Sequence, residues 1–320
     1  MILSLYLLHQ RNELFDELLD LRRSLWETSI VSPLDNGNTR YSRRILSPTE
    51  ELIFIGGMPR SGTTLMRVML DSHQEIRCGD ETMLIPLLLN AHSSATRDLH
   101  NSTLKPKAVN DAVSAFISEL IAKNGPTANR LCNKDPFQLL HIPYLMELFP
   151  NARFIFMIRD PRAVLHSMIS RDVPVAGFNF SDPIDMLKQW EKHFKKMYLQ
   201  CRNTPGTCLT VYYERLVQAS EEEARRILKF LRVEWSDAVL HHEELMGSEV
   251  LVNPQEFSAS QVKEKINQKA LTSWFDFFSD DFLDNINRIS PLVSSLGYDT
   301  LSSKPDYSKF GSPDFYTFHI

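Results

Sequence analysis

A glycine-bounded loop between Gly57 and Thr64 carries residues suited to binding an anion. The loop follows a run of β-branched and aromatic residues and opens onto an apolar-periodic segment, which is the layout of a strand, a phosphate-binding loop and a helix N-terminus. It nearly matches the pattern G-x-x-x-x-G-K-[ST], but Thr63 replaces the lysine. The cation of the loop is Arg60, whose planar fork of donors suits a phosphate or sulfate. The loop therefore predicts an anion site, and the missing lysine argues against ATP.

A second set of donors follows the apolar run at residues 153–158, which leads into Arg159. A capping residue and a proline come next and predict a helix that runs toward Arg171: they are Asp160 and Pro161. Ser167 and Arg171 are four residues apart and would share a face of this helix. A guanidinium that follows a buried strand needs a partner, so these three side chains predict a second anion site. Taken alone, Arg171 fits a solvated helix face better.

The elements that must position these residues alternate between strands and helices over short connections. This pattern predicts an α/β fold, with a P-loop-like parallel sheet flanked by helices. Strands are expected from about residue 51 up to the loop and at residues 130–133, 153–158 and 209–213, and helices at roughly 109–123 and 220–231. Ligands bind at the carboxyl ends of such strands. Both anion sites fall there, together with residues 133–135 and 213–214.

The chain has 320 residues, of which 43% are hydrophobic, so it can build a large core. We expect one domain over residues 51–300, after an N-terminal helix or arm and linker over 1–50 and before an irregular tail over 301–320. A net charge of −5 argues against a general nucleic-acid binder. No stretch offers the roughly 20 apolar residues that cross a bilayer, so an anchor is not seen in this sequence.

The four cysteines permit two disulfides or four reduced thiols, and composition alone slightly favours thiols: they are Cys78, Cys132, Cys201 and Cys208. Two glycosylation sequons, at Asn101 and Asn179, point weakly to a secretory lumen instead. Metal-ligand spacing is absent apart from His241-His242-Glu243-Glu244, which reads better as part of a helix surface. We therefore expect no metal cofactor.

The two anion-binding segments resemble the cofactor signatures of sulfotransferases, which use 3′-phosphoadenosine 5′-phosphosulfate (PAPS). The wider chain resembles protein-tyrosine sulfotransferases over roughly residues 50–300. The motifs that carry this resemblance are residues 58–67, 77–82, 131–137, 166–171 and 239–244. The resemblance implies a sulfotransferase fold and transfer of a sulfuryl group from PAPS to tyrosine hydroxyls of acidic secretory proteins. It also implies a membrane-associated, Golgi-lumenal homodimer with disulfides Cys78–Cys132 and Cys201–Cys208.

The same resemblance implies a role for each matching residue. The loop residues would hold the 5′-phosphosulfate: Arg60, Ser61, Gly62, Thr63 and Thr64. The 3′-phosphate and the rest of the nucleotide would be bound by a second group: Arg159, Ser167, Arg171, Tyr213 and Asn253. Glu81 would be the general base, and Lys134 would join Arg60 in stabilising charge during transfer. A tyrosine hydroxyl has a pKa of about 10, so a positioned carboxylate helps it attack near neutral pH.

The acceptor side departs from the family pattern. Met83 and Leu87 stand where the family has arginines that contact the acidic acceptor peptide. A family lysine could be Lys263 or Lys265, since the register falls on Glu264. These departures leave other functions open. The chain could sulfate a carbohydrate or a small alcohol or phenol, it could be a catalytically weak family member or a non-catalytic nucleotide-binding module, or, as the last-ranked alternative, it could be a P-loop kinase.

Overall fold

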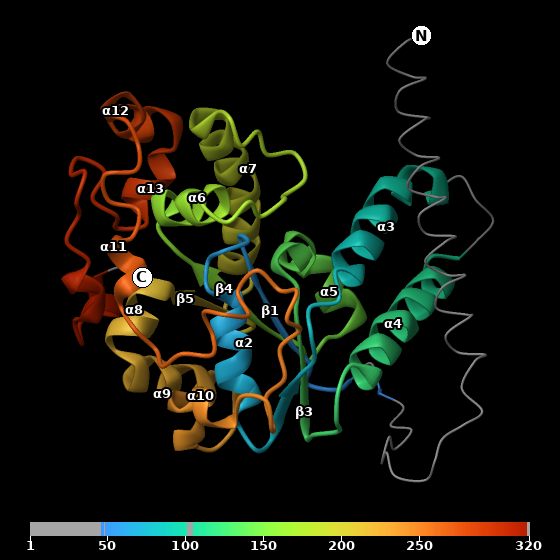
Figure 1. Cartoon of the computed structure of the whole chain (residues 1–320). Coiled ribbons are helices and arrows are strands. Elements are labelled where there is room, and N and C mark those ends of the chain that lie inside the picture. The colour runs from blue at the N-terminus through green and yellow to red at the C-terminus, as the bar shows by residue number, and fades with distance from the viewer. Residues whose placement is uncertain (1–45, 48, 101–104, 319–320) are drawn as a thin grey trace. The chain divides into compact units, whose positions relative to one another are not determined.

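A computed structural model describes residues 46–47, 49–100 and 105–318, and five parallel strands form its central sheet (Figure 1). The strands lie in the order β2-β3-β1-β4-β5. Their bounds are Ile53–Gly57 for β1, Ile76–Cys78 for β2, Arg130–Lys134 for β3, Arg153–Ile158 for β4 and Cys208–Tyr212 for β5. The central β1 pairs with β3 on one side and β4 on the other. The predicted α/β class with a parallel sheet is confirmed.

Helices cover both faces of the sheet. They are α2 (Thr63–Asp71), α3 (Leu84–His100), α4 (Pro106–Lys123), α5 (Ile142–Leu148), α6 (Pro161–Ile169), α7 (Pro183–Arg202), α8 (Tyr213–Gln218), α9 (Ser220–Leu231), α10 (His242–Leu245), α11 (Lys269–Thr272), α12 (Asp280–Ile289), α13 (Pro291–Ser295) and α14 (Phe315–Phe318). Short 3₁₀ helices lie at Pro136–His141 (η1), Asp237–Leu240 (η2) and Ser308–Gly311 (η3). The helix predicted at 220–231 is confirmed as α9, and the one at 109–123 begins three residues earlier, as α4.

Each face of the sheet has its own core, because successive strand side chains point to opposite faces. Phe54 and Phe156 pack on one face with the apolar sides of α4, α5 and α7. Ile55 and Met157 pack on the other face with α2 and α9. Because all the strand pairs are parallel, the carboxyl ends of the five strands lie at one edge of the sheet.

Helix α6 is shorter than the sequence predicts. The predicted helix runs toward Arg171, but α6 ends at Ile169. Asp172 adopts a left-handed backbone with φ 47°, and Pro174 follows, so the helix cannot continue. The prediction that Ser167 and Arg171 share a helix face is therefore wrong. The predicted cap is confirmed, since Asp160 accepts a hydrogen bond of 2.9 Å from the backbone N–H of Arg162.

The C-terminal segment is packed rather than free. The tail over 301–320 is expected to be irregular, but its described part, residues 301–318, includes η3 and α14. Tyr307, Phe310 and Phe315 are buried and join the core that contains Tyr212. Aromatic anchors hold the segment in place without any periodic pattern in the sequence. Residues 1–45, which make up most of the predicted arm and linker, lie outside the described part of the chain. The sequon at Asn101 lies outside it as well.

Two disulfides tie elements together. Cys78 of β2 is bonded to Cys132 of β3, and Cys201 at the end of α7 is bonded to Cys208 at the start of β5. Both pairings are those that the family resemblance implies, and the thiols favoured by composition are not present. Among the described residues, no helix combines the length and the apolar character that a membrane span requires.

Candidate active site

The loop between β1 and α2 is shaped to bring backbone amides toward a ligand. Gly62 adopts φ 98°, and a Cβ on it would lie 2.6 Å from the ring of Tyr213, so only glycine fits there. The first-turn N–H groups of α2 follow directly, and a helix leaves such groups without an intrahelical acceptor. The hydroxyl of Ser61 is buried and has no hydrogen-bond partner among the described residues. These unsatisfied donors fit an anion.

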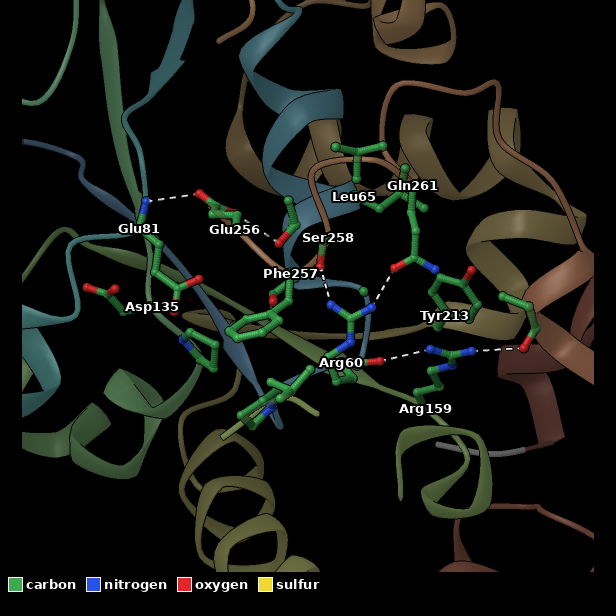
Figure 2. A pocket seen from close by; sticks show the side chains of 18 of the residues that line it. Arg60, Leu65, Glu81, Asp135, Arg159, Tyr213, Glu256, Phe257, Ser258 and Gln261 are labelled. Atoms are coloured by element: carbon green, nitrogen blue, oxygen red, sulfur yellow. Dashed lines mark hydrogen bonds between the residues drawn. The ribbon is translucent and has the colours of Figure 1, made fainter. Parts of the chain in front are cut away.

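Arg60 lies at the centre of this edge of the sheet, with a positive φ of 71°. Its guanidinium donates to the hydroxyl of Ser167 at 3.0 Å. It also donates to the hydroxyl of Ser258 at 2.6 Å and to the side-chain oxygen of Gln261 at 2.5 Å (Figure 2). Burial, together with the positive charge of Arg159, lowers the pKa of Arg60 to about 10. The hydrogen-bond partners of the guanidinium are thus neutral oxygens, and the nearby arginines outweigh the opposing charge of Glu81, which is a setting that attracts an anion.

Arg159 extends the basic edge. It donates to the backbone carbonyls of Arg60 at 2.9 Å and Ala270 at 2.8 Å, and its guanidinium lies over the ring of Tyr213, 4.4 Å from the ring centre. Ser167 is buried beside Arg60. Arg171 is exposed beyond the end of α6, although its charge still contributes to lowering the pKa of Arg60. The two predicted anion sites thus meet in one continuous basic region.

A second group of charges lies beside the phosphate-binding loop. Lys134 is completely buried and forms ion pairs with Glu81 and with Glu256, the latter at 3.1 Å. Glu256 also accepts hydrogen bonds of 3.4 Å from the Thr64 hydroxyl and from the backbone N–H of Glu81. Figure 2 shows the contact between the Glu81 backbone nitrogen and the Glu256 carboxylate, with the Glu81 side chain pointing away from Glu256. The predicted base and the predicted lysine are therefore in direct contact.

Asp135 fixes the turn that carries Glu81. Its carboxylate accepts hydrogen bonds from the backbone N–H groups of Thr82 and Met83, at 3.1 and 2.9 Å, and from the Thr82 hydroxyl at 2.6 Å. Burial raises the pKa of Asp135 to about 6, against the opposing effect of these hydrogen bonds. Met83, held in this turn with φ 58°, is 69% exposed.

The sequence analysis did not identify Glu256 or Asp135 as site residues. Glu256 belongs to a segment without periodicity, and it is 122 residues from Lys134 in the sequence. No local signal could have found it. Asp135 follows Lys134 directly, at the end of β3, and a carboxylate at the carboxyl end of a buried strand is a signal that could have been used.

A cavity of about 490 Å³ joins the two groups of charges. Its lining includes most of the predicted site residues, namely Arg60, Gly62, Thr63, Thr64, Glu81, Arg159, Tyr213 and Asn253. Lys134, Ser61 and Ser167 lie buried behind this lining, whereas Leu87 and Arg171 are not part of it. Met83 and Lys265 line it. The volume is in the usual range for a small-molecule site.

Within the described part of the chain, one cluster could gather three metal ligands: His241, Glu243 and Glu244. It does not line this cavity. His241 instead pairs with Asp237 at 3.2 Å, and Glu243 lies 3.8 Å from the Lys265 ammonium. The cluster lies at the start of the short helix α10, where His242 of the same motif is completely buried and the Glu243 side chain is 10% exposed.

Comparison with known proteins identifies the class. A sequence profile described as "Sulfotransferase family" matches residues 52–237. Two solved sulfotransferase domains share the fold. The domain of the Synechococcus PCC 7002 olefin synthase has a TM-score of 0.54 and 20% identity, over 82% of this chain and 99% of that domain. The domain of the curacin biosynthetic pathway has a TM-score of 0.57 and 19% identity, over 78% and 99%. The fold is that of a sulfotransferase.

Closer relatives narrow the class to one family. Protein-tyrosine sulfotransferase 1 of Danio rerio is 42% identical over 90% of this chain and 82% of its own length. Protein-tyrosine sulfotransferase 1 of Homo sapiens is 43% identical over 81% and 72%. A Caenorhabditis briggsae protein that carries the family name provisionally is 56% identical over 86% of this chain and 98% of its own length. The chain belongs to the protein-tyrosine sulfotransferase family.

Proposed function

We propose that this protein transfers a sulfuryl group from PAPS to the hydroxyl of tyrosine residues in proteins. The observation that carries the proposal is that one cavity holds an anion site around Arg60 on one side and the Glu81–Lys134 ion pair on the other. An anion site binds the donor, and a carboxylate beside a buried cation can activate a hydroxyl. The names of the relatives point to the same reaction.

The residues at this edge fit PAPS. Its 5′-phosphosulfate would be held by the α2 amides and by the side chains of the loop, where the unpaired Ser61 hydroxyl and the desolvated Arg60 supply donors. Its 3′-phosphate would be held at the far side by Arg159 and Ser167, with exposed Arg171 approaching from the turn beyond α6. Tyr213 offers a ring for the nucleotide, and Asn253 an amide. When bound, PAPS supplies the activated sulfuryl group.

The chain's own residues would carry the reaction as follows. Glu81 accepts the proton of the tyrosine hydroxyl while the phenolic oxygen forms a bond to sulfur. The bond from sulfur to the bridging oxygen breaks, and its electron pair stays on the 5′-phosphate that leaves. Lys134 and Arg60 stabilise the negative charge that grows on these oxygens, since fixed cations in a site shielded from water need no reorganisation. Asp135 holds the turn that presents Glu81.

Several finer points are part of the same proposal. We expect acidic tyrosine-containing substrates, a Golgi-lumenal location and a homodimer, as in the family that the sequence resembles. Asn179 is exposed at the start of its sequon, which supports its glycosylation. The two disulfides also suit an oxidising compartment.

One observation favours a second acceptor class. Met83 is exposed and lines the cavity where the resemblance leads us to expect an arginine. An apolar rim suits a small phenol or a carbohydrate better than it suits an acidic peptide. This second candidate keeps the donor, Glu81 and Lys134 and changes only the acceptor.

An acceptor panel tests the proposed function. Purified protein is incubated with labelled PAPS and, in separate reactions, an acidic tyrosine peptide, the same peptide with phenylalanine for tyrosine, a small phenol and an oligosaccharide. We expect label in the tyrosine peptide and none in its phenylalanine counterpart. Label only in the phenol or the oligosaccharide would replace the tyrosine assignment with the second candidate.

A further inference from the structure

A segment far along the chain closes over the site. Residues 253–262, here called the capping segment, connect α10 toward α11 and cross the carboxyl edge of the sheet as the orange loop beside α2 (Figure 1). The segment contains no regular helix or strand. Its contacts with the site are polar: Ser258 and Gln261 accept from Arg60, and Glu256 accepts from Lys134. The capping segment therefore contacts Arg60 and Lys134, the two cations that we propose bind the sulfuryl donor.

The position of Glu256 is that of an anion bound in the site. Its carboxylate lies 3.1 Å from the Lys134 ammonium and 3.4 Å from the Thr64 hydroxyl. Both groups would act on the phosphosulfate in the proposed function. The Glu256 side chain is only 10% exposed, so its charge has left water and depends on these partners. A donor anion at the same partners would have to displace it.

The way the segment is attached allows such a displacement. Its C-terminal end is anchored by Val262, which is buried against Val68 and Val250 and whose carbonyl lies 3.0 Å from the His242 ring nitrogen. Ala259, three residues after Glu256, is also buried, but the contacts of the Glu256 side chain are polar and the neighbouring Phe257 is 49% exposed. Breaking a few polar contacts would free Glu256 while Val262 stays in place.

We propose that Glu256 is an internal competitor of the sulfuryl donor. In the structure its carboxylate pairs with Lys134, which Glu81 also contacts, and accepts from the Thr64 hydroxyl of the phosphate-binding loop, and PAPS binds by displacing it. The inference rests on the proposed function, because it takes Lys134 and Thr64 to bind the phosphosulfate of PAPS. It adds that the capping segment sets the donor affinity from within the chain.

The test measures binding of 3′-phosphoadenosine 5′-phosphate (PAP), the nucleotide product, by calorimetry. Glu256→Gln keeps the shape of the side chain and removes its charge. We expect this variant to bind PAP about tenfold more tightly than the wild type, because the competing ion pair is lost. Glu256→Ala serves as a second variant, and thermal melting shows that each variant is folded. Glu249→Gln removes a charge from an exposed site just before the capping segment and should leave the affinity unchanged.

The outcomes separate the two proposals. Tighter binding by both Glu256 variants, or binding by the variants when the wild type does not bind, supports the internal competitor. Equal or weaker binding by the variants while the wild type binds PAP overturns it and leaves the proposed function standing. If neither the wild type nor any variant binds PAP, the proposed donor is wrong and the inference falls with it.

Discussion

Arg60 shows how a single side chain can define an anion site. Three neutral oxygens accept its hydrogen bonds, and two further arginines lie near enough to depress its pKa. An ordinary structural arginine would be paired with a carboxylate, as Arg162 is with Asp160. The charge of Arg60 is therefore not neutralised by a hydrogen-bonded carboxylate and is available to bind a ligand.

Substituting Arg60 by lysine tests whether the fork of donors matters as well as the charge. Lysine keeps the charge but cannot form two parallel hydrogen bonds to one anion. We expect Arg60→Lys to weaken PAP binding roughly 10- to 100-fold, the usual range for losing a charged hydrogen bond. Calorimetry gives the affinity, and Arg225→Lys, an exposed change on α9, is the control. Unchanged binding by Arg60→Lys would show that the fork is not used.

Residues at the ends of predicted strands could be found from the sequence. Arg60, Lys134 and Arg159 all follow or end apolar runs, and the structure places them at one edge. Glu81 was identified only through the family resemblance, since no local pattern marks it. Glu256 escaped both approaches, because a loop without periodicity gives no sign of where it will pack. Its contacts come from tertiary structure alone.

At the scale of elements, the C-terminal tail joins the core although no periodic pattern in the sequence marks it. Phe310 is completely buried, stacks on Tyr298 and packs against Tyr212 of β5. Tyr307 donates a hydrogen bond of 2.8 Å to Asp160, the cap of α6. The tail thus supports the strand and helix that follow the basic edge.

Truncating the Phe310 side chain should therefore destabilise the whole domain. We expect Phe310→Ala to lower the free energy of unfolding by about 3–5 kcal/mol, as large-to-small changes in cores do. Leu301→Ala, in the same tail but 92% exposed, should stay within about 0.5 kcal/mol of the wild type. Urea unfolding followed by circular dichroism compares the two. Similar small effects for both variants would mean that the tail is not part of the core.

The two disulfides should differ in how much each contributes to the free energy of unfolding. Cys78–Cys132 closes a loop with a sequence separation of 54, and Cys201–Cys208 one of 7. Chain entropy alone predicts stabilisation of about 4 and about 2 kcal/mol respectively. We expect the double alanine variant of the first pair to unfold at lower urea concentration than that of the second. The reverse order would show that enthalpic effects outweigh loop closure here.

Strands and helices with strong patterns were predictable, whereas the shortest strand, β2, and the end of α6 were not. The apolar runs of β1 and β4 predicted both central strands. The three-residue β2, with Arg77 in its middle, carries too little pattern to be seen. The end of α6 depends on the left-handed Asp172, a conformation that the sequence does not announce. The sequence therefore predicts the presence of a helix or strand more accurately than the residues at which it ends.

For the molecule as a whole, buried acids tie stability to pH. Burial raises the pKa of Glu214 to about 7, with the charge of Asp160 adding to it, although Asp160 also donates a backbone hydrogen bond that opposes the shift. Burial likewise raises the pKa of Asp71 to about 6. The native state therefore keeps protons that the unfolded chain releases from about pH 4 upward, so these groups stabilise less as the pH rises toward 7.

Glu214→Gln isolates this effect. Burial of His141 lowers its pKa to about 4 and acts in the opposite direction, so the clean quantity is the difference between the variant and the wild type. Glutamine cannot ionise, so the variant should gain on the order of 3 kcal/mol relative to the wild type between pH 4.5 and 8. Urea unfolding across this range gives the difference. A difference that does not vary with pH would show that Glu214 stays ionised in the native state.

The central claim is that one cavity binds PAPS and uses Glu81 to activate a tyrosine. Its most direct test is the rate of sulfuryl transfer from labelled PAPS to a tyrosine peptide by the wild type and by Glu81→Gln, with PAP affinity measured for both. We expect the rate to fall about 100- to 10,000-fold, the usual effect of losing a general base. PAP binding should be retained or tightened, because Glu81 also forms an ion pair with Lys134. Transfer by the variant at the wild-type rate, or no transfer by the wild type at saturating PAPS, would contradict the account.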